Sequence, residues 1–404
     1  MKAIRIVCGK PIPPFLDPTG EVPVLNVPLA KAQEAALDAA GVTLVSAPPS
    51  GEPYLLFSDR TWFTRRAIDA LVAAGPGQMK IDDVAWWAAN GALQELGADG
   101  LMELAVVPAD APPMFSGLTP VVVDLGLRDV DPPDLHPAMR HAMRPMRLGG
   151  AMVHQVDHWT HILRINQLAL AARAENARLG WEEMGWLSRI WFVLVLLLRV
   201  RSTKKARILA ALSERKGKAD IHPTAVVELC VIGEGVKIGP HAVVRASVLA
   251  DGATVEEHAT VNFSSLGEGA TVGRYGMLNL SVLYPSAMTS SGGGFQASVF
   301  GTESFVAWGA TILDLSFGRS IPVSRCGARV DSGQHFLGAA IGHRAKIGNS
   351  VRLTYGLDVP NDAFLVAPAG DLVRDTTSVQ PGVACRAVDG RATPIKKPTP
   401  TEKT

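Results

Sequence analysis

The sequence predicts an α/β domain, a helical linker and a left-handed parallel β-helix, in that order along 404 residues. Short aliphatic runs alternate with helical patterns up to about residue 150, and the pattern then becomes almost entirely helical. After residue 220, aliphatic residues recur at steps of five or six. A chain of this length is expected to bury at least two cores. We assign residues 1–150, 151–219 and 220–388 to these parts, and 389–404 to a disordered tail rich in Pro, Thr and Lys.

The first part has the alternation typical of an α/β domain. Strands are expected at Ala3–Cys8, Val42–Ser46, Tyr54–Ser58, Ala105–Val107 and Pro120–Leu125. Apolar residues at three- and four-residue steps predict helices at Leu29–Ala40, Thr64–Ala74, Asp83–Leu96 and Leu135–Met143. Ligands of such folds bind beyond the carboxyl ends of the strands, which here include Gly9-Lys10 and Asp59-Arg60.

The sequence pattern of the linker predicts two helices between Asp157 and Arg215, separated near Gly180 and Gly185. Its nine-residue apolar run, Ile190–Leu198, is shorter than the roughly 20 residues of a membrane span. Burial against another domain or subunit is the favoured interpretation. The alternative is peripheral membrane contact through residues 190–218, because cations follow the run closely. These cations are Arg199, Arg201, Lys204, Lys205, Arg207, Arg215, Lys216 and Lys218.

The third part repeats a six-residue unit of one aliphatic residue followed by small, turn-forming ones. The aliphatic positions are Ile232, Ile238, Val244, Leu249, Val255, Val261, Leu266, Val272 and Leu278, and later Ile341, Ile347, Leu353, Val359 and Leu365. Three units complete a coil, with each aliphatic residue stacked about 4.8 Å from its equivalent in the next coil. This period is typical of the left-handed β-helix of the hexapeptide-repeat family.

Two stretches interrupt the period, and we expect both to project as loops. Tyr284–Ala297 is rich in Ser, Gly and Pro, and Leu315–Leu337 is an excursion punctuated by glycine. Insertions on one face of a solenoid commonly form its binding face. We therefore expect a functional role for the second loop.

Composition limits the partners. A formal net charge of +1 gives no global field for nucleic acid or a membrane surface, so cationic patches are local, at Arg199–Lys218 and Arg319–Arg329. Four cysteines without metal-like spacing favour a reducing compartment. The N-terminus has no signal-peptide pattern. The expected location is cytoplasmic.

Three segments carry a family resemblance: Pro23–Ala40, Val156–Leu170 and Trp308–Gly348. The layout and these segments resemble sugar-1-phosphate nucleotidylyltransferases fused to an acyltransferase-type β-helix, especially the archaeal bifunctional enzymes. The resemblance covers residues 220–370 well and 1–150 poorly. It implies a homotrimer acting on a sugar phosphate or nucleotide sugar, with a coenzyme A thioester as acyl donor.

The N-terminal domain departs from the family pattern and is expected to be a reduced nucleotidyltransferase-like domain. The family's Gly-rich phosphate loop is replaced by Cys8–Pro14, whose prolines lack amide donors, and its Pro-Lys step by Glu21-Val22-Pro23. Lys10, Asp59 and Arg60 remain as candidate binding residues. Asp59 stands where the family has its metal ligand, which implies Mg²⁺ there.

The β-helix also departs from the family, because no histidine lies between His258 and His335. We predict His335 and His343 as substitutes for the general base of acyl transfer. His343 occupies a hexapeptide corner, where an outward-pointing, exposed histidine is the alternative. The candidate binding residues are Trp308, Thr311, Asp314, Arg319, Arg325 and Arg329.

The favoured function is coenzyme A-dependent acyl transfer to a sugar phosphate or nucleotide sugar by the trimeric β-helix. A catalytically silent scaffold or regulatory subunit and a nucleotide-sugar sensor are the alternatives from another class. Sugar-1-phosphate nucleotidyl transfer is a further alternative. Trimer formation is expected because the apolar linker segment Trp186–Leu198 needs burial.

Overall fold

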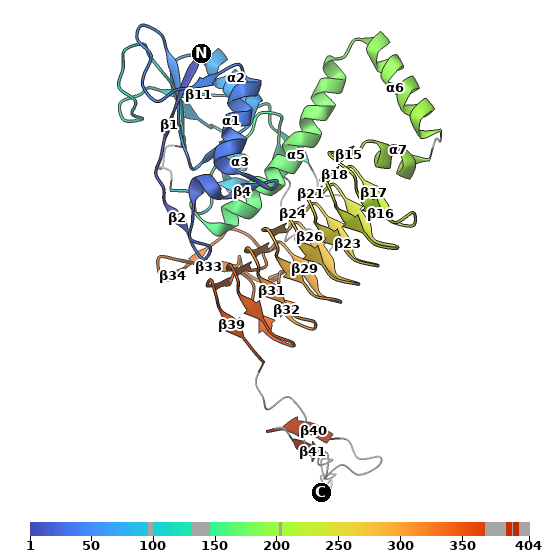
Figure 1. Ribbon diagram of the computed structural model, residues 1–404. Helices are drawn as coiled ribbons and strands as arrows, with labels where there is room; N and C mark the ends of the chain where they lie inside the picture. Colours follow the sequence, from blue (N-terminus) through green and yellow to red (C-terminus); the bar gives the residue numbers. More distant parts are fainter. Residues whose placement is uncertain (96–99, 131–145, 202–203, 368–384, 390, 396–404) are drawn as a thin grey trace, which may run out of the picture.

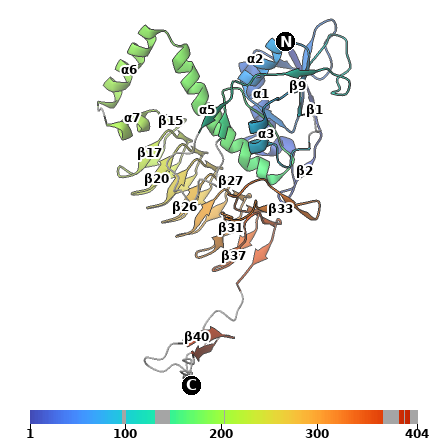
Figure 2. The ribbon, with the colours of Figure 1, turned by 180° about the vertical axis from the view of Figure 1, so that it is seen from behind.

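The computed structural model describes residues 1–95, 100–130, 146–201, 204–367, 385–389 and 391–395. An α/β domain and a solenoid of parallel strands lie side by side, and helix α5 (Trp159–Glu183) runs between them (Figure 1). The same arrangement is seen from behind in Figure 2. The predicted fold class is confirmed: a mixed α/β sheet, long helices, and then a β-helix whose three parallel sheets stack coil on coil.

The α/β domain is built on a six-stranded sheet in the order β11-β9-β10-β7-β1-β6. β1 pairs in parallel with β6 and β7, whereas β10 is antiparallel to β7 and β9. The strands are β1 (Lys2–Ile6), β6 (Thr43–Leu44), β7 (Tyr54–Ser58), β9 (Gly77–Lys80), β10 (Leu101–Val107) and β11 (Pro120–Val122). All five predicted strands are present in part or whole. The sequence analysis missed β9, which lacks an aliphatic run.

The helices of this domain are α1 (Leu29–Ala39), α2 (Arg65–Ala74) and α3 (Val84–Asn90). α3 is shorter than predicted and ends before Gly91, and the predicted helix Leu135–Met143 lies outside the described residues. Short ribbons and one 3-10 turn complete the domain. They are β2 (Pro11–Ile12), β3 (Asp17–Pro18), η1 (Thr19–Glu21), β4 (Pro23–Val24), β5 (Val27–Pro28), β8 (Thr61–Phe63), β12 (Arg128–Val130), β13 (Met146–Leu148) and β14 (Val153–Gln155).

The linker contains three helices rather than two: α5, α6 (Trp186–Val200) and α7 (Lys205–Ala211). The first break follows Glu183, because Met184 leaves the helical conformation. The buried residues of α5 lie in its first 17 positions, up to Glu175, so its second half leaves the body of the protein. Among the helices within the described ranges, none is both long and apolar enough to cross a membrane.

Between Glu214 and Val299 the β-helix has coils of 17 residues, two hexapeptides and one pentapeptide, whereas the coil with the hairpin insertion spans 41 residues and the last spans 18. Partners in adjacent coils show this register: Val231, Val248, Ser265, Val282 and Val299. The first sheet consists of β15 (Glu214–Arg215), β18 (Val231–Ile232), β21 (Val248–Leu249), β24 (Ser265–Leu266), β27 (Val282–Leu283), β30 (Val299–Phe300), β35 (Ala340–Ile341) and β38 (Asp358–Val359). The second consists of β16 (Asp220–Ile221), β19 (Lys237–Ile238), β22 (Thr254–Val255), β25 (Thr271–Val272), β28 (Met288–Thr289), β31 (Phe305–Val306), β36 (Lys346–Ile347) and β39 (Phe364–Leu365).

The third sheet consists of β17 (Val226–Glu228), β20 (Val243–Arg245), β23 (Thr260–Asn262), β26 (Met277–Asn279) and β29 (Gly294–Gln296), and β32 (Thr311–Ile312) pairs with β37 (Arg352–Leu353). A ladder of buried serines links the coils after this sheet. Each hydroxyl donates to the carbonyl two residues earlier. The first three accept the backbone N–H of the next serine at 3.1 Å, and the last accepts that of Ala339 at 3.2 Å. The serines are Ser247, Ser264, Ser281 and Ser298. The ladder satisfies amides that the corner would otherwise leave unpaired.

The two predicted loops have different outcomes. Leu315–Leu337 is an insertion, as expected, and forms the hairpin β33 (Pro322–Arg325) and β34 (Ala328–Asp331). The prediction for Tyr284–Ala297 was wrong, because this stretch forms a regular coil that includes β28 and β29. In the expected tail, residues 391–394 form strand β41 (Arg391–Pro394), paired with β40 (Cys385–Val388), and residues 396–404 lie outside the described range.

A shared core joins the two halves. The outward side chains of the first sheet, including Val282, Val299 and Ala340, are buried beneath Trp159 and other residues of α5 and beneath Phe15 of the α/β domain. Side chains of this kind are exposed on a free solenoid. Their burial means that the α/β domain is held firmly against the β-helix.

Candidate functional site

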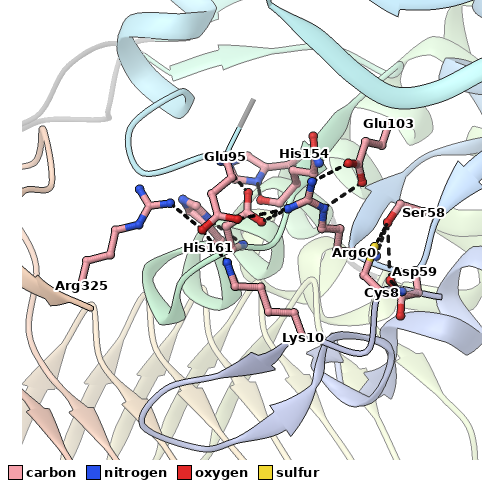
Figure 3. A network of polar contacts seen from close by, with 12 residues as sticks. Cys8, Lys10, Ser58, Asp59, Arg60, Glu95, Glu103, His154, His161 and Arg325 are labelled. Atoms are coloured by element: carbon pink, nitrogen blue, oxygen red, sulfur yellow. Dashed lines mark hydrogen bonds and ion pairs between the residues drawn. The ribbon is translucent and has the colours of Figure 1, made fainter. Parts of the chain in front are cut away.

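A cluster of charged side chains lies at the carboxyl ends of β1 and β7, where the α/β domain meets the β33–β34 hairpin (Figure 3). β1 and β7 are parallel neighbours, so the segments that follow them emerge at the same edge of the sheet. Lys10 follows β1, and Asp59 and Arg60 follow β7. The three candidate residues predicted for this domain are therefore brought together.

Asp59 holds the loop after β1. Its two carboxylate oxygens accept the backbone N–H groups of Cys8 at 3.0 Å and Gly9 at 3.1 Å. The side chain is almost fully buried. Both oxygens are thus committed to amides, and Asp59 does not fit the role of Mg²⁺ ligand that the resemblance implied. Among the side chains that the structure describes, no group of three or more His, Cys, Asp or Glu is arranged to hold a metal ion.

Arg60 is fixed between two carboxylates. Its guanidinium donates Nε–H to Glu103 at 2.8 Å, a second bond to the same carboxylate, and a bond to Asp157. These bonds raise the pKa of Arg60 and keep it charged, and the hydrogen bond to Glu103 has the largest effect. The Asp157 side chain is fully buried, and burial raises its pKa although Arg60 opposes the change.

Glu95 is the point where three cations converge. Its carboxylate accepts from Lys10, accepts from Arg325 at 3.0 Å and lies 3.6 Å from Arg60. Lys10 and then Arg325 lower the pKa of Glu95. The backbone N–H of Glu95 also donates to Asp157 at 2.8 Å. Lys10, Arg60 and Arg325 come from three separate elements and converge on this carboxylate, which is 38% exposed, and Arg60 is also paired with Glu103 and Asp157.

Three histidines lie behind this charged cluster. His154 and His161 contact each other edge to face, with ring centroids 5.0 Å apart, and His158 lies 6.3 Å from His161. Nε2 of His161 donates to the carbonyl of Ala92 at 2.9 Å, and Nε2 of His158 donates to that of Ser324 at 2.9 Å. Burial lowers the pKa of both His158 and His161 to about 4 and that of His154 well below its ordinary value.

His161 and His158 therefore join the start of α5 to the α/β domain and to the hairpin as neutral rings, whereas His154 lies on β14. Sequence reasoning missed them, together with Glu95 and Glu103. The spacing of His154, His158 and His161, at the start of a predicted helix, is the signal that marks one buried helix end.

His343 lies at a different place from the charged cluster. Its side chain points outward from the coil, as expected, but it is only 8% exposed, so the alternative of an exposed corner residue was wrong. Its Nδ1 accepts the N–H of Thr302 at 2.8 Å and its Nε2 lies 3.1 Å from Asp17. The ring packs against Phe15, with centroids 5.4 Å apart. The α/β domain covers this corner, and the local hexapeptide pattern carries no sign of that long-range contact.

The remaining candidates are dispersed over the β-helix. Arg325 joins the charged cluster, whereas Arg329 of the same hairpin donates to the carbonyl of Pro322. Asp314 accepts from Gln296 at 2.8 Å, and burial raises its pKa. His335 is half-buried. The other three are exposed at corners and strand ends: Trp308, Thr311 and Arg319.

The described geometry gives one place where cations converge. Lys10 and Arg60 lie at the sheet edge where α/β folds bind ligands, and Arg325 reaches them from the hairpin. Such a set can hold an anion. No protein-family model and no curated protein matches this chain.

Proposed function

We propose that this protein binds a sugar phosphate or nucleotide sugar through its phosphate, at the carboxyl ends of β1 and β7, without transferring a nucleotidyl group. The convergence of Lys10, Arg60 and Arg325 on one carboxylate carries the proposal. Arginine suits phosphate because its planar donors match two oxygens at once. The sugar class follows from the resemblance of the layout to sugar-1-phosphate nucleotidylyltransferases.

Binding without transfer is supported by Asp59. Nucleotidyl transfer needs free amides to cradle phosphates and carboxylates to hold a metal ion. Here the carboxylate of Asp59 is bonded to the loop amides of Cys8 and Gly9, so each of these groups already satisfies the other. The loop is built to be rigid rather than to accept a triphosphate. This favours the sensor among the functions expected from the sequence.

Glu95 stands where the ligand phosphate would be. Its ion pairs with Lys10 and Arg325 are partly exposed, and pairs of this kind contribute about 1 kcal/mol or less each. A phosphate carries more charge than a carboxylate and can accept from all three cations. The ligand is therefore expected to displace Glu95 rather than to bind beside it.

Calorimetric titration of the full chain with UDP-sugars, sugar-1-phosphates and inorganic phosphate tests the proposal. Each titration is made with and without Mg²⁺, and pyrophosphate release from a nucleoside triphosphate supplied together with the sugar-1-phosphate is measured in parallel. We expect Mg²⁺-independent binding and no pyrophosphate. Arg60→Gln should lose binding, whereas Lys31→Met, a distant exposed control, should keep it.

Glu95→Gln sharpens the test. It removes one competing anion from two half-exposed ion pairs, so affinity for phosphate should rise on the order of tenfold. Wild-type and Glu95→Gln proteins that both fail to bind any of these ligands would refute the proposal and favour a scaffold. Pyrophosphate release would instead show that the protein transfers a nucleotidyl group.

Coenzyme A-dependent acyl transfer has less support from the geometry. A general base needs a free lone pair, and both ring nitrogens of His343 are engaged, by Thr302 and Asp17. His335 is left as the candidate base. A rise in melting temperature with coenzyme A that His335→Gln abolishes would favour this activity over the sensor.

A further inference from the structure

Helix α6 exposes apolar side chains around its whole circumference. Five consecutive residues, Trp191 to Val195, are between 40% and 66% exposed. Successive helical residues are about 100° apart, so five of them cover every side of the helix. An ordinary surface helix hides its apolar stripe against the body. The exposed apolar residues of α6 are Trp186, Leu187, Ile190, Trp191, Phe192, Val193, Leu194, Val195, Leu197 and Leu198.

Within the described residues, most of this helix is left uncovered by the rest of the chain. Both views show the second half of α5 and all of α6 extending away from the α/β domain and beyond the stacked coils (Figures 1 and 2). The contacts that brace α6 are local: Phe192 meets Trp181 of α5 at 5.8 Å between ring centroids, and Arg189 lies over the Trp181 ring. The helix is thus held away from the body of the protein by the second half of α5.

The charge around α6 has one sign. Between Met184 and Ser213 the sequence contains six Lys or Arg residues and no Asp or Glu. Trp186 and Trp191 are 69% and 66% exposed, and tryptophan is enriched where proteins meet the headgroup layer of a bilayer. The 15 residues of α6 rise only about 22 Å, less than the roughly 30 Å hydrocarbon core.

We propose that α6 is an interfacial anchor that inserts at the boundary between the headgroups and the acyl chains of an anionic lipid bilayer. Lipid can surround a helix that is apolar on all sides, whereas a protein partner covers one face. A second copy of α6 is a poorer occupant, because two such segments would bring their positive charges together. An anionic surface neutralises the same cations.

Flotation of the full chain with vesicles tests the anchor, using phosphatidylcholine alone and phosphatidylcholine with 30% phosphatidylserine by design. We expect co-flotation with the anionic vesicles, a fall of tenfold or more in bound protein without phosphatidylserine, and a further fall at high salt. Trp191→Glu/Leu194→Glu should abolish binding. Phe364→Glu, an equally exposed apolar residue at the far end of the solenoid, is the matched control and should bind as wild type.

Circular dichroism shows whether each variant is folded, and light scattering gives its mass. Wild-type protein that stays unbound with anionic vesicles overturns the anchor. So does equal binding of wild type and the Trp191→Glu/Leu194→Glu variant. A wild-type oligomer that this variant converts to monomer, with no vesicle binding by either, identifies a second copy as the occupant and also overturns it.

Discussion

Lowering the pH from 7 to 5 should destabilise the junction between the α/β domain and α5, because His158 and His161 are held there as neutral rings. Nδ1 of His158 accepts the N–H of Thr160, and Nδ1 of His161 accepts that of Asp157. A proton added at Nδ1 would face an N–H group and be buried. Burial accordingly lowers the pKa of both rings to about 4.

The direction and size follow from the two pKa values. In the unfolded chain a histidine has a pKa of about 6.5, so between pH 6.5 and 4 that chain takes up protons that the folded protein refuses. The free energy of unfolding therefore falls as the pH falls through this window. At pH 5 the loss is about 2 kcal/mol per ring, a large fraction of a typical stability of about 5–15 kcal/mol.

Urea unfolding at pH 7 and pH 5, followed by tryptophan fluorescence, measures the effect. Trp159 packs beside His158 at 5.7 Å between ring centroids and reports on this region. The double variant His158→Gln/His161→Gln keeps a donor and an acceptor at each position but takes up no proton, so its stability should depend less on pH. His222→Gln, which alters an exposed residue, is the control. Equal pH dependence in wild type and the double variant would refute the reasoning.

Three further predictions concern the scaffold. Gly338→Ala places a Cβ 2.0 Å from the Ser298 hydroxyl oxygen, so we expect a loss of about 1–3 kcal/mol and a lower melting temperature, whereas Gly318→Ala meets nothing within 4 Å and should be neutral. Ser281→Ala leaves the buried N–H of Ser298 without its acceptor, which should cost about 1–3 kcal/mol in urea unfolding. Asp59→Asn should speed hydrogen exchange at the Cys8 and Gly9 amides on the order of tenfold, and unchanged exchange would show that Asp59 does not hold the loop.

The solenoid could be predicted because each coil repeats its inward residues locally. The same rule explains the error at Tyr284–Ala297. There the inward positions are Thr289 and Phe295, in register with Val272 and Leu278 of the preceding coil. A polar and an aromatic residue interrupt the aliphatic series, yet both are buried, and Phe295 packs edge to face against Phe300 at 5.6 Å. A residue is buried because of its position in the coil, whatever its type. A search for aliphatic residues alone therefore misses buried positions such as Thr289 and Phe295.

The charged cluster could be predicted only in part. Lys10 and Arg60 follow two adjacent parallel strands, and strand order alone places them together. Glu95 follows a short helix, and Arg325 lies 230 residues further along the chain, in the hairpin of another domain. Neither position has a periodicity or motif that links it to the strand ends. Their meeting depends on the docking of the two halves, which is a property of the whole fold.

Because the site lies where the two halves dock, ligand binding is expected to change how firmly they are held together. The hairpin contacts the α/β domain through Arg325 to Glu95 and through the carbonyl of Ser324 to His158. A phosphate that displaces Glu95 substitutes one anion for another, so Arg325 keeps a partner and the hairpin stays docked. Loss of both anions would leave Lys10 and Arg325 without these partners while Arg60 keeps its pairs with Glu103 and Asp157, and the repulsion among the cations would oppose docking. Ligand binding is therefore expected to tighten the junction between the two halves rather than to open it.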